Sequence, residues 1–295
     1  MRRALLAPFL LTCTLSLAYQ QHPHTRAALG STHRSSDTTL TDQQKQLANT
    51  LCLDGMPEKT STDLGPTEFI FRKGYVLEHS SLDKIPLWVC EHVTADQLGP
   101  DTNRSNKFKA DEDLKGPHST PADYARSGYD QGHQAPAANQ GKNQELQDET
   151  FRMSNMAPQR PTMNRQAWRS LETLTRKWVT DNSEAYEITG PIFYDPKEDD
   201  RQTADGTITF LTIGKDAVAV PTHFYKIILV KDKDTGNWKS IAFVMPNIAT
   251  YKSPYHLEQY IQSIRWIEQH TGLNFMPDLP AQQAQELEAT ASPMW

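Results

Sequence analysis

Short runs of β-forming residues, separated by turn residues and interrupted by only two segments of helical periodicity, constrain the fold of this chain more than any other feature. The length of 295 residues is enough for one large core or two modest ones. A composition of 37% hydrophobic and 22% charged residues excludes a collagen, a coiled coil and general disorder. No internal repeat is visible, and no linker rich in Gly, Ser or Pro divides the chain. We therefore expect a single mixed α/β domain over residues 46–295.

The predicted strands lie between Gly, Pro and Asp/Lys turns. An alternating run over Phe69–Leu77, followed by Leu87–Val93, predicts a hairpin. The later β-rich runs cover Ala185–Thr189, Thr207–Ile213, His223–Val230 and Ser240–Met245. Residues 95–128 are polar and repeatedly broken by Pro and Gly, which predicts a long surface loop. Loops of that length inside a compact domain are usually functional.

Two helices are predicted from apolar spacing. Residues 164–179 carry apolar side chains at three- and four-residue intervals, at Ala167, Leu171, Leu174 and Trp178. A last helix is predicted over 257–271, ending before Gly272 at a helix C-terminal position. The expected core includes Trp88, Phe193, Phe224, Phe243, Trp266 and Phe275. His223 lies in a strand-like run and is interpreted as structural.

The first 18 residues resemble an export signal, because Arg2 and Arg3 precede an apolar run that is too short to span a bilayer. The alternative is an ordinary buried N-terminal helix. A lipid anchor at Cys13 is less well supported, since no small residue stands directly before that cysteine. Residues 19–45 are rich in Ser, Thr, Gln and His, which predicts a disordered lead-in to the folded domain.

After removal of the signal, the chain carries 28 basic and 36 acidic residues, a net charge of −8. No further stretch has membrane-spanning length, so we expect a soluble protein that is periplasmic or secreted. In an oxidising compartment Cys52 and Cys90 are predicted to form a disulfide; the alternative is two separately buried thiols. The three cysteines show no spacing typical of a structural zinc site.

Two local patterns suggest chemistry. The run Gly128–Pro136 contains His133 after a turn-prone Asp-x-Gly; alone, such a histidine is more often a hydrogen-bonded turn residue than a catalyst. On the predicted helix, Asn164 and Glu172 are about 80° apart around the axis and about 12 Å apart along it. An amide oxygen and a carboxylate on one broad face suit a hydrated Mg²⁺, and the alternative is a helix-start Asn with a solvated Glu.

Five blocks, in order along the chain, resemble the DNA/RNA non-specific endonucleases, the ββα-metal family of endonuclease G and the secreted Serratia nuclease. The blocks are Asp130–His133, Met153–Gln159, Met163–Glu172, Thr189–Pro191 and Val218–Lys226. The resemblance extends from about Leu51 to Pro280, and the spacing from histidine to asparagine to glutamate is specific. It implies an α+β fold with a central, mostly antiparallel sheet flanked by helices and a ββα-metal active-site motif.

The resemblance implies roles for individual residues. His133, in the catalytic block with Asp130 and Gln131, would be the general base, so activity should fade below a histidine pKa of roughly 6.5. Asn164 would ligate a single Mg²⁺, with Mn²⁺ as the alternative, and Glu172 would orient the waters of that metal. The implied reaction is sugar-non-specific hydrolysis of DNA and RNA that leaves 5′-phosphate and 3′-hydroxyl ends. Family members also dimerise, although the sequence itself does not fix the oligomeric state.

One departure concerns Gln131, where the family normally has Arg directly before the Gly-His pair. Glutamine cannot grip phosphate bidentately as arginine does. Arg104 is the best candidate for a remaining phosphate clamp and catalytic cation, against the alternative of a solvated loop residue. Further substrate-binding candidates, which the sequence does not rank, are Arg126, Arg160 and Arg165.

Charge distribution is consistent with binding to the phosphate backbone without sequence specificity. Residues 104–177 hold 12 basic and 9 acidic residues, a net charge of +3, whereas the rest of the mature chain carries −11. Because Gln131 replaces arginine, two other functions stay open. The first is a catalytically impaired nucleic-acid-binding homologue, and the second is a phosphodiesterase with a narrower substrate range.

Overall fold

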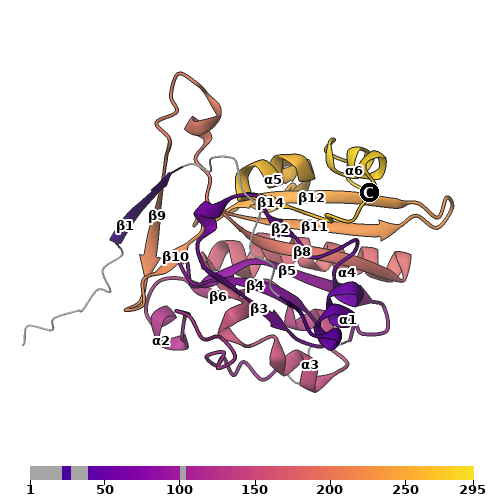
Figure 1. Cartoon of the computed structure of the whole chain (residues 1–295), viewed down its shortest axis with the longest axis horizontal. Coiled ribbons are helices and arrows are strands. Elements are labelled where there is room, and N and C mark those ends of the chain that lie inside the picture. The colour runs from indigo at the N-terminus through magenta and orange to yellow at the C-terminus, as the bar shows by residue number, and fades with distance from the viewer. Residues whose placement is uncertain (1–21, 28–38, 100–103) are drawn as a thin grey trace, which may run out of the picture.

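The computed structural model describes residues 22–27, 39–99 and 104–295 (Figure 1). The predicted signal peptide and Cys13 lie outside these residues. A seven-stranded sheet forms the centre of the molecule, in the order β13-β12-β11-β8-β5-β4-β3, and every pairing in it is antiparallel. In that order the strands are Ile261–Gln262, Trp238–Pro246, His223–Lys231, Glu184–Ile192, Ile85–Thr94, Val76–Ser80 and Thr67–Phe71. The predicted fold class is confirmed.

Both faces of this sheet are covered. Along β11, Phe224 and Ile228 point into one apolar cluster, while the alternate residues Tyr225 and Ile227 point into another. The first cluster packs under α4 (Arg169–Asn182). The second is covered by α1 (Asp42–Leu51), α5 (Ile264–Thr271) and α6 (Ala281–Glu288). Figure 1 shows α5 and α6 along one side of β11 and β12, with α2 and α3 at the opposite end of the view.

Smaller elements complete the fold. The short helices are α2 (Pro121–Tyr124) and α3 (Gln144–Glu149), with 3-10 turns at Thr62–Leu64, Ala137–Gln140, Met153–Asn155, Pro196–Asp199 and Leu257–Tyr260. A three-stranded sheet combines β1 (His22–Ala27), β9 (Thr207–Ile213) and β10 (Val218–Val220), and a two-stranded one combines β2 (Glu58–Lys59) and β14 (Leu273–Asn274). No helix in the described ranges is both long and apolar enough to cross a membrane.

The predicted disordered lead-in over 19–45 is wrong for the residues that form β1 and the start of α1. Strand β1 pairs with β9 along its whole length, and Arg26 forms an ion pair with the buried carboxylate of Asp83. The guanidinium also lies 4.5 Å from the ring centroid of Phe193. A buried acid that needs a cation, together with an aromatic surface, explains why this polar segment is held against the domain.

Two predicted elements have different boundaries. The single strand predicted over residues 69–77 is two strands, β3 and β4, because the chain turns back between Arg72 and Tyr75, whose backbone N–H and C=O are hydrogen-bonded at 2.9 Å. The predicted helix over 257–271 begins only at Ile264, since Ser263 caps it by accepting a hydrogen bond from the backbone N–H of Trp266. The predicted C-terminal glycine, Gly272, is confirmed in the left-handed conformation.

Most of the predicted core aromatic residues are buried: Trp88, Phe193, Phe224, Phe243 and Phe275. Trp266 is half-buried against the second cluster. The predicted disulfide is not formed, because Cys52 and Cys90 are free thiols in the same cluster. Burial raises the pKa of Cys90 well above its usual value, and a hydrogen bond with Cys52 raises it further. The two thiols therefore pack as small apolar side chains in mutual contact.

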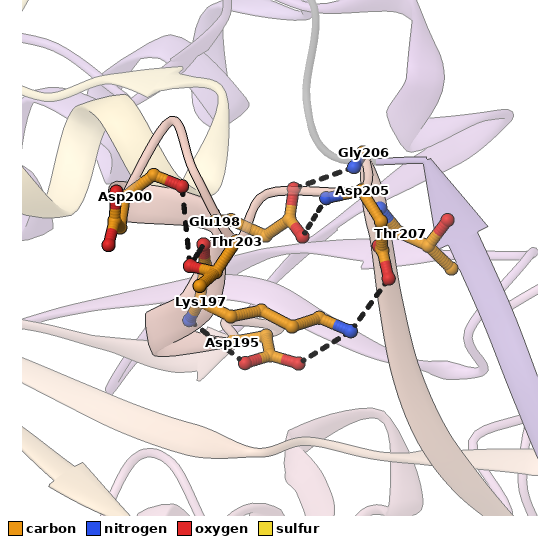
Figure 2. A network of polar contacts seen from close by, with 8 residues as sticks. All are labelled: Asp195, Lys197, Glu198, Asp200, Thr203, Asp205, Gly206 and Thr207. Carbon is orange, nitrogen blue, oxygen red and sulfur yellow. Dashed lines mark hydrogen bonds and ion pairs between the residues drawn. The ribbon is translucent and has the colours of Figure 1, made fainter.

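The connection from β8 to β9 is acidic and closes on itself (Figure 2). The carboxylate of Glu198 accepts hydrogen bonds from the backbone N–H groups of Asp205 and Gly206, at 3.1 and 2.9 Å. Lys197 bridges Asp195 and Asp205. The contacts drawn in Figure 2 all join residues of this one loop, so they account for its shape without a ligand.

Candidate active site

A two-stranded ribbon followed by a helix forms the candidate site. Strand β6 (Asp130–His133) pairs antiparallel with β7 (Met156–Gln159), and a π-helical turn over Met163–Trp168 then leads into α4. His133, Asn164, Glu172 and Arg104 line one cleft between these elements. The structure thus brings together four residues that were predicted from three separate parts of the sequence. Single π-turns inside helices are frequent at functional sites.

His133 is buried among aromatic rings beside the cleft. Its ring centroid lies 4.8 Å from that of Phe151, edge to face, and 5.6 Å from that of Phe108. Burial and, secondarily, the nearby positive charge of Arg104 lower the pKa of His133 to about 3. Its Nε2 atom is buried and has no hydrogen-bond partner among the described residues. The imidazole is therefore neutral at physiological pH, and the residue lines the cleft.

Asn155 fixes the backbone that follows His133. Its side chain is fully buried and accepts a hydrogen bond from the N–H of Ala135 at 2.8 Å. Its amide nitrogen donates to the carbonyls of Ala135 and Thr150, at 3.0 and 2.9 Å. Gly132 is equally constrained, because a Cβ there would lie 2.3 Å from the side chain of the buried Gln159. The position of His133 is therefore set by buried contacts on both sides.

Asp130 joins the ribbon to the π-turn. Its Oδ2 accepts a hydrogen bond from the amide nitrogen of Asn164 at 2.9 Å. The guanidinium of Arg165 donates twice to the same carboxylate, from Nε at 2.8 Å and from Nη2 at 2.6 Å. The contact orients the amide of Asn164, whose nitrogen faces Asp130 while its oxygen is left to accept or to ligate another group.

Glu172 lines the cleft from the first turn of α4. Burial raises the pKa of this carboxyl above its usual value, and the positive charge of Lys226 is the largest effect that opposes the rise. Arg176 opposes it as well, and Glu187 reinforces it. The ionisation of Glu172 therefore depends on Arg176 of the same helix and on two charged residues beneath the helix, Lys226 and Glu187.

Lys226 and Glu187 belong to a buried charged cluster on the face of the sheet under α4. Lys226 is fully buried, and its Nζ donates to Glu187 Oε2 and to Thr189 Oγ1, both at 2.7 Å. Glu187 lies directly opposite Glu91 in the pairing of β5 with β8. Burial, and then the charge of Glu187, raises the pKa of Glu91 well above its usual value. One lysine thus lies beside two buried carboxyl groups, and the charge of Glu187 favours the protonated form of Glu91.

Of the four arginines predicted to bind substrate, two line the cleft and two do not. Arg104 lines the cleft, with its guanidinium 5.2 Å from the ring centroid of Phe151 and its Nε donating to Asn106. Arg165 lines the same cleft. Arg126 is exposed with a left-handed backbone, and Arg160 stacks on Tyr129 at 4.3 Å, and neither lines the cleft.

Two cations in the cleft were not named from the sequence. Arg169 and Arg176 lie three residues before and four residues after Glu172 on α4, and both line the cleft. Positions i−3 and i+4 fall on the same helix face, so this spacing was the available signal. Gln131, which stands opposite Pro158 in the ribbon, does not line the cleft.

The donors present fit a hydrated hard cation. The described residues hold no group of three or more His, Cys, Asp or Glu side chains arranged around a metal position. The cleft instead offers one amide oxygen, from Asn164, and one carboxylate, from Glu172. Mg²⁺ prefers oxygen ligands and keeps several of its waters, so it requires few direct protein ligands.

Comparison with known proteins identifies a single family. The sequence profile of the DNA/RNA non-specific endonucleases matches residues 55–282. The chain is 37% identical over 221 residues to "Endonuclease G, mitochondrial" from Bos taurus, which covers 74% of this chain and 72% of that protein. It is 38% identical over 219 residues to "Nuclease C1" from Cunninghamella echinulata var. echinulata, which covers 72% and 84%. The fold matches a crystal structure of the EndoG/EndoGI complex with a TM-score of 0.69 and 30% identity, over 83% of this chain and 96% of that one.

Proposed function

Because the chain belongs to the DNA/RNA non-specific endonuclease family and is therefore a nuclease hydrolase, we propose that it cleaves both DNA and RNA in the cleft between β6 and α4. The observation that carries this proposal is that His133, with its neutral imidazole, lines one cleft together with Asn164 and Glu172. The arginines around these groups give the phosphate backbone a positive surface without any base-reading element.

His133 acts as the general base. Its neutral imidazole takes a proton from water while the hydroxide oxygen forms a bond to phosphorus. The bond from phosphorus to the 3′ oxygen breaks, and that oxygen takes a proton from solvent, which leaves 5′-phosphate and 3′-hydroxyl ends. Asn155 and Gly132 keep the imidazole in position by fixing the backbone on either side of it. Arg104 binds a phosphate oxygen at the edge of the cleft.

Asn164 through its amide oxygen, and Glu172 through water, would hold Mg²⁺, with Mn²⁺ as the alternative. When bound, the ion neutralises negative charge on the phosphate and on the departing oxygen. Asp130 contributes by orienting the amide of Asn164.

The decisive experiment is digestion of plasmid DNA and of RNA by the purified mature chain, with Mg²⁺ or with EDTA. His133→Ala and Asn164→Ala should each lose at least about a hundredfold in rate while keeping their circular dichroism spectra. His256→Ala, which changes an exposed histidine outside the cleft, is the matched control and should cut like the wild type. Products that a ligase joins without prior phosphorylation would establish the 5′-phosphate. Equal cleavage by His133→Ala and the wild type would contradict the proposal.

A second candidate function rests on Gln131, which replaces the family arginine. A binding protein without catalysis would hold DNA but leave it intact under all metal conditions. A nuclease of narrower range would cut only one of duplex DNA, single-stranded DNA and RNA at equal salt. The digestion experiment separates these alternatives from the main proposal.

We also propose that the chain is exported and processed near residue 18, and that it forms a homodimer. N-terminal sequencing of the protein from fractionated cells tests the first point. Because the chain is similar to "Endonuclease G, mitochondrial", the contrary outcome is removal of a longer leader that targets an organelle. Light scattering on the purified protein tests whether it is a dimer, and the mass of a monomer would contradict the proposal.

A further inference from the structure

Gln131 stands where the resemblance to the family leads us to expect an arginine directly before the Gly-His pair. The side chain of Gln131 is half-buried and does not line the cleft. Of the three arginines that the sequence left unranked, only Arg165 lines the cleft. It follows Asn164 directly, in the π-turn that faces β6.

The guanidinium of Arg165 is oriented and still has donors to offer. Asp130 engages its Nε and one Nη2 hydrogen, and the arginine fork carries five N–H donors in all. The remaining donors point away from the carboxylate, and the side chain is 69% exposed. The two hydrogen bonds with Asp130 thus hold the guanidinium plane in one orientation, and the opposite edge of the guanidinium is open to a ligand.

We propose that Arg165 binds a phosphate of the nucleic acid, and that it supplies from the π-turn the cation that this chain lacks at Gln131. The inference rests on the proposed nuclease function and identifies a residue that binds its substrate. Phosphate oxygens match the open edge of the fork, and Arg104, Arg169 and Arg176 make the same cleft positive. Asp130, the residue next to Gln131 in the chain, contributes by holding Arg165 through two hydrogen bonds.

A purely structural role for Arg165 would be to hold Asp130, and through it Asn164, without contact with substrate. The two roles differ in what they predict in the absence of metal. A phosphate ligand affects DNA affinity and its dependence on salt, since each phosphate neutralised contributes about 0.9 to the slope of log K against log salt. A merely structural residue affects the catalytic rate in Mg²⁺ and leaves that slope unchanged.

The test measures binding of a fluorescent duplex by the non-cleaving His133→Ala protein in EDTA, over a range of salt concentrations. Adding Arg165→Gln should weaken binding by about tenfold or more and reduce the slope by about one. Asp130 keeps its hydrogen bond from Asn164 in this variant but loses its cation, which accounts for part of the loss of affinity, so the salt slope is the readout that identifies the phosphate contact. Arg201→Gln, which removes one positive charge from the exposed loop after Pro196–Asp199, is the matched control and should leave both quantities unchanged.

Rescue gives a second, independent readout. Placing Gln131→Arg in the Arg165→Gln background should restore both the affinity and the slope, and in the presence of His133 it should restore cleavage. Unfolding temperatures of all variants control for loss of structure. An unchanged salt slope in Arg165→Gln would overturn the inference, whatever the affinity. Failure of Gln131→Arg to restore the affinity and the slope would overturn the claim that Arg165 supplies the cation missing at position 131. If the wild type neither binds nor cuts DNA or RNA, the proposed function itself fails and this inference fails with it.

Discussion

Replacing the buried Lys226 with methionine should both destabilise the domain and change the pH dependence of the cleft. The Nζ of Lys226 is fully buried and donates to Glu187 and Thr189, both at 2.7 Å. Its removal leaves the Glu187 carboxylate buried without a cation. Breaking a buried pair in this way costs about 3–5 kcal/mol. For a domain of this size, that lowers the unfolding temperature by roughly 6 to 20 °C.

The same substitution should move the acid limb of the pH–rate profile. In the proposed mechanism Glu172 must be ionised to orient water around the metal, so activity is expected to fall as pH drops through its pKa. That pKa is already raised by burial, and Lys226 is the largest effect that opposes the rise. Without Lys226 the pKa of Glu172 rises further, and the limb shifts to higher pH. His133 does not define this limb, because its own pKa is lowered to about 3.

A double variant, Lys226→Met with Glu187→Met, is the control. Replacing both members of a buried pair with apolar side chains of similar size is often neutral or stabilising, so most of the lost stability should return. The acid limb should then lie between those of the wild type and the single variant, because the two lost charges act on Glu172 in opposite directions. Thermal unfolding and kcat/KM from pH 4 to 8 measure the two effects. An acid limb at the same pH in all three proteins would refute the reasoning.

Three further predictions concern the scaffold around the site. Asn155→Ala should lower the free energy of unfolding by about 3 kcal/mol, measured by urea denaturation, since it leaves three buried backbone groups without hydrogen-bond partners; a loss below about 1 kcal/mol would contradict this. Gly132→Ala should reduce kcat more than it raises KM, because a Cβ would displace the buried Gln159 or the strand that carries the histidine. Under non-reducing denaturation, peptides containing Cys52 and Cys90 should both be alkylated, as seen by mass spectrometry; a disulfide-linked pair would count against the free thiols.

Local patterns predicted the elements whose ends are set by their own residues. The strand expected over Thr207–Ile213 is observed with those bounds, and the helix expected over 164–179 is observed from Met163 to Asn182, although its start is π-helical. Elements that depend on a distant partner were predicted less well. Strand β1 forms because it pairs with β9 and because Arg26 binds Asp83. Residues 22–27 carry no local signal for either contact.

Only part of the site was predicted, because its assembly also depends on contacts between residues that are distant in the sequence. His133, Asn164 and Glu172 were found from spacing and resemblance, and the structure places them on one cleft. The arginines could not be ranked, because which of them reaches the cleft depends on the paths of loops and turns. Arg160 is turned onto Tyr129 by stacking, whereas Arg165 is held at the cleft by Asp130.

The charged cluster beneath α4 shows why strand alternation alone could not predict the surroundings of Glu172. In β8, polar residues such as Glu187 alternate with apolar ones, a pattern that in antiparallel sheets usually indicates one solvent-facing side, whereas in β11 Lys226 interrupts a continuous apolar run. Here both sides are covered, and the polar residues lie under α4, where Glu91 becomes the neighbour of Glu187 only through the pairing of β5 with β8. Buried charge of this kind costs stability unless it is paired. Its position directly below the helix that carries Glu172 gives the sheet an electrostatic influence on the cleft, which the substitution of Lys226 measures.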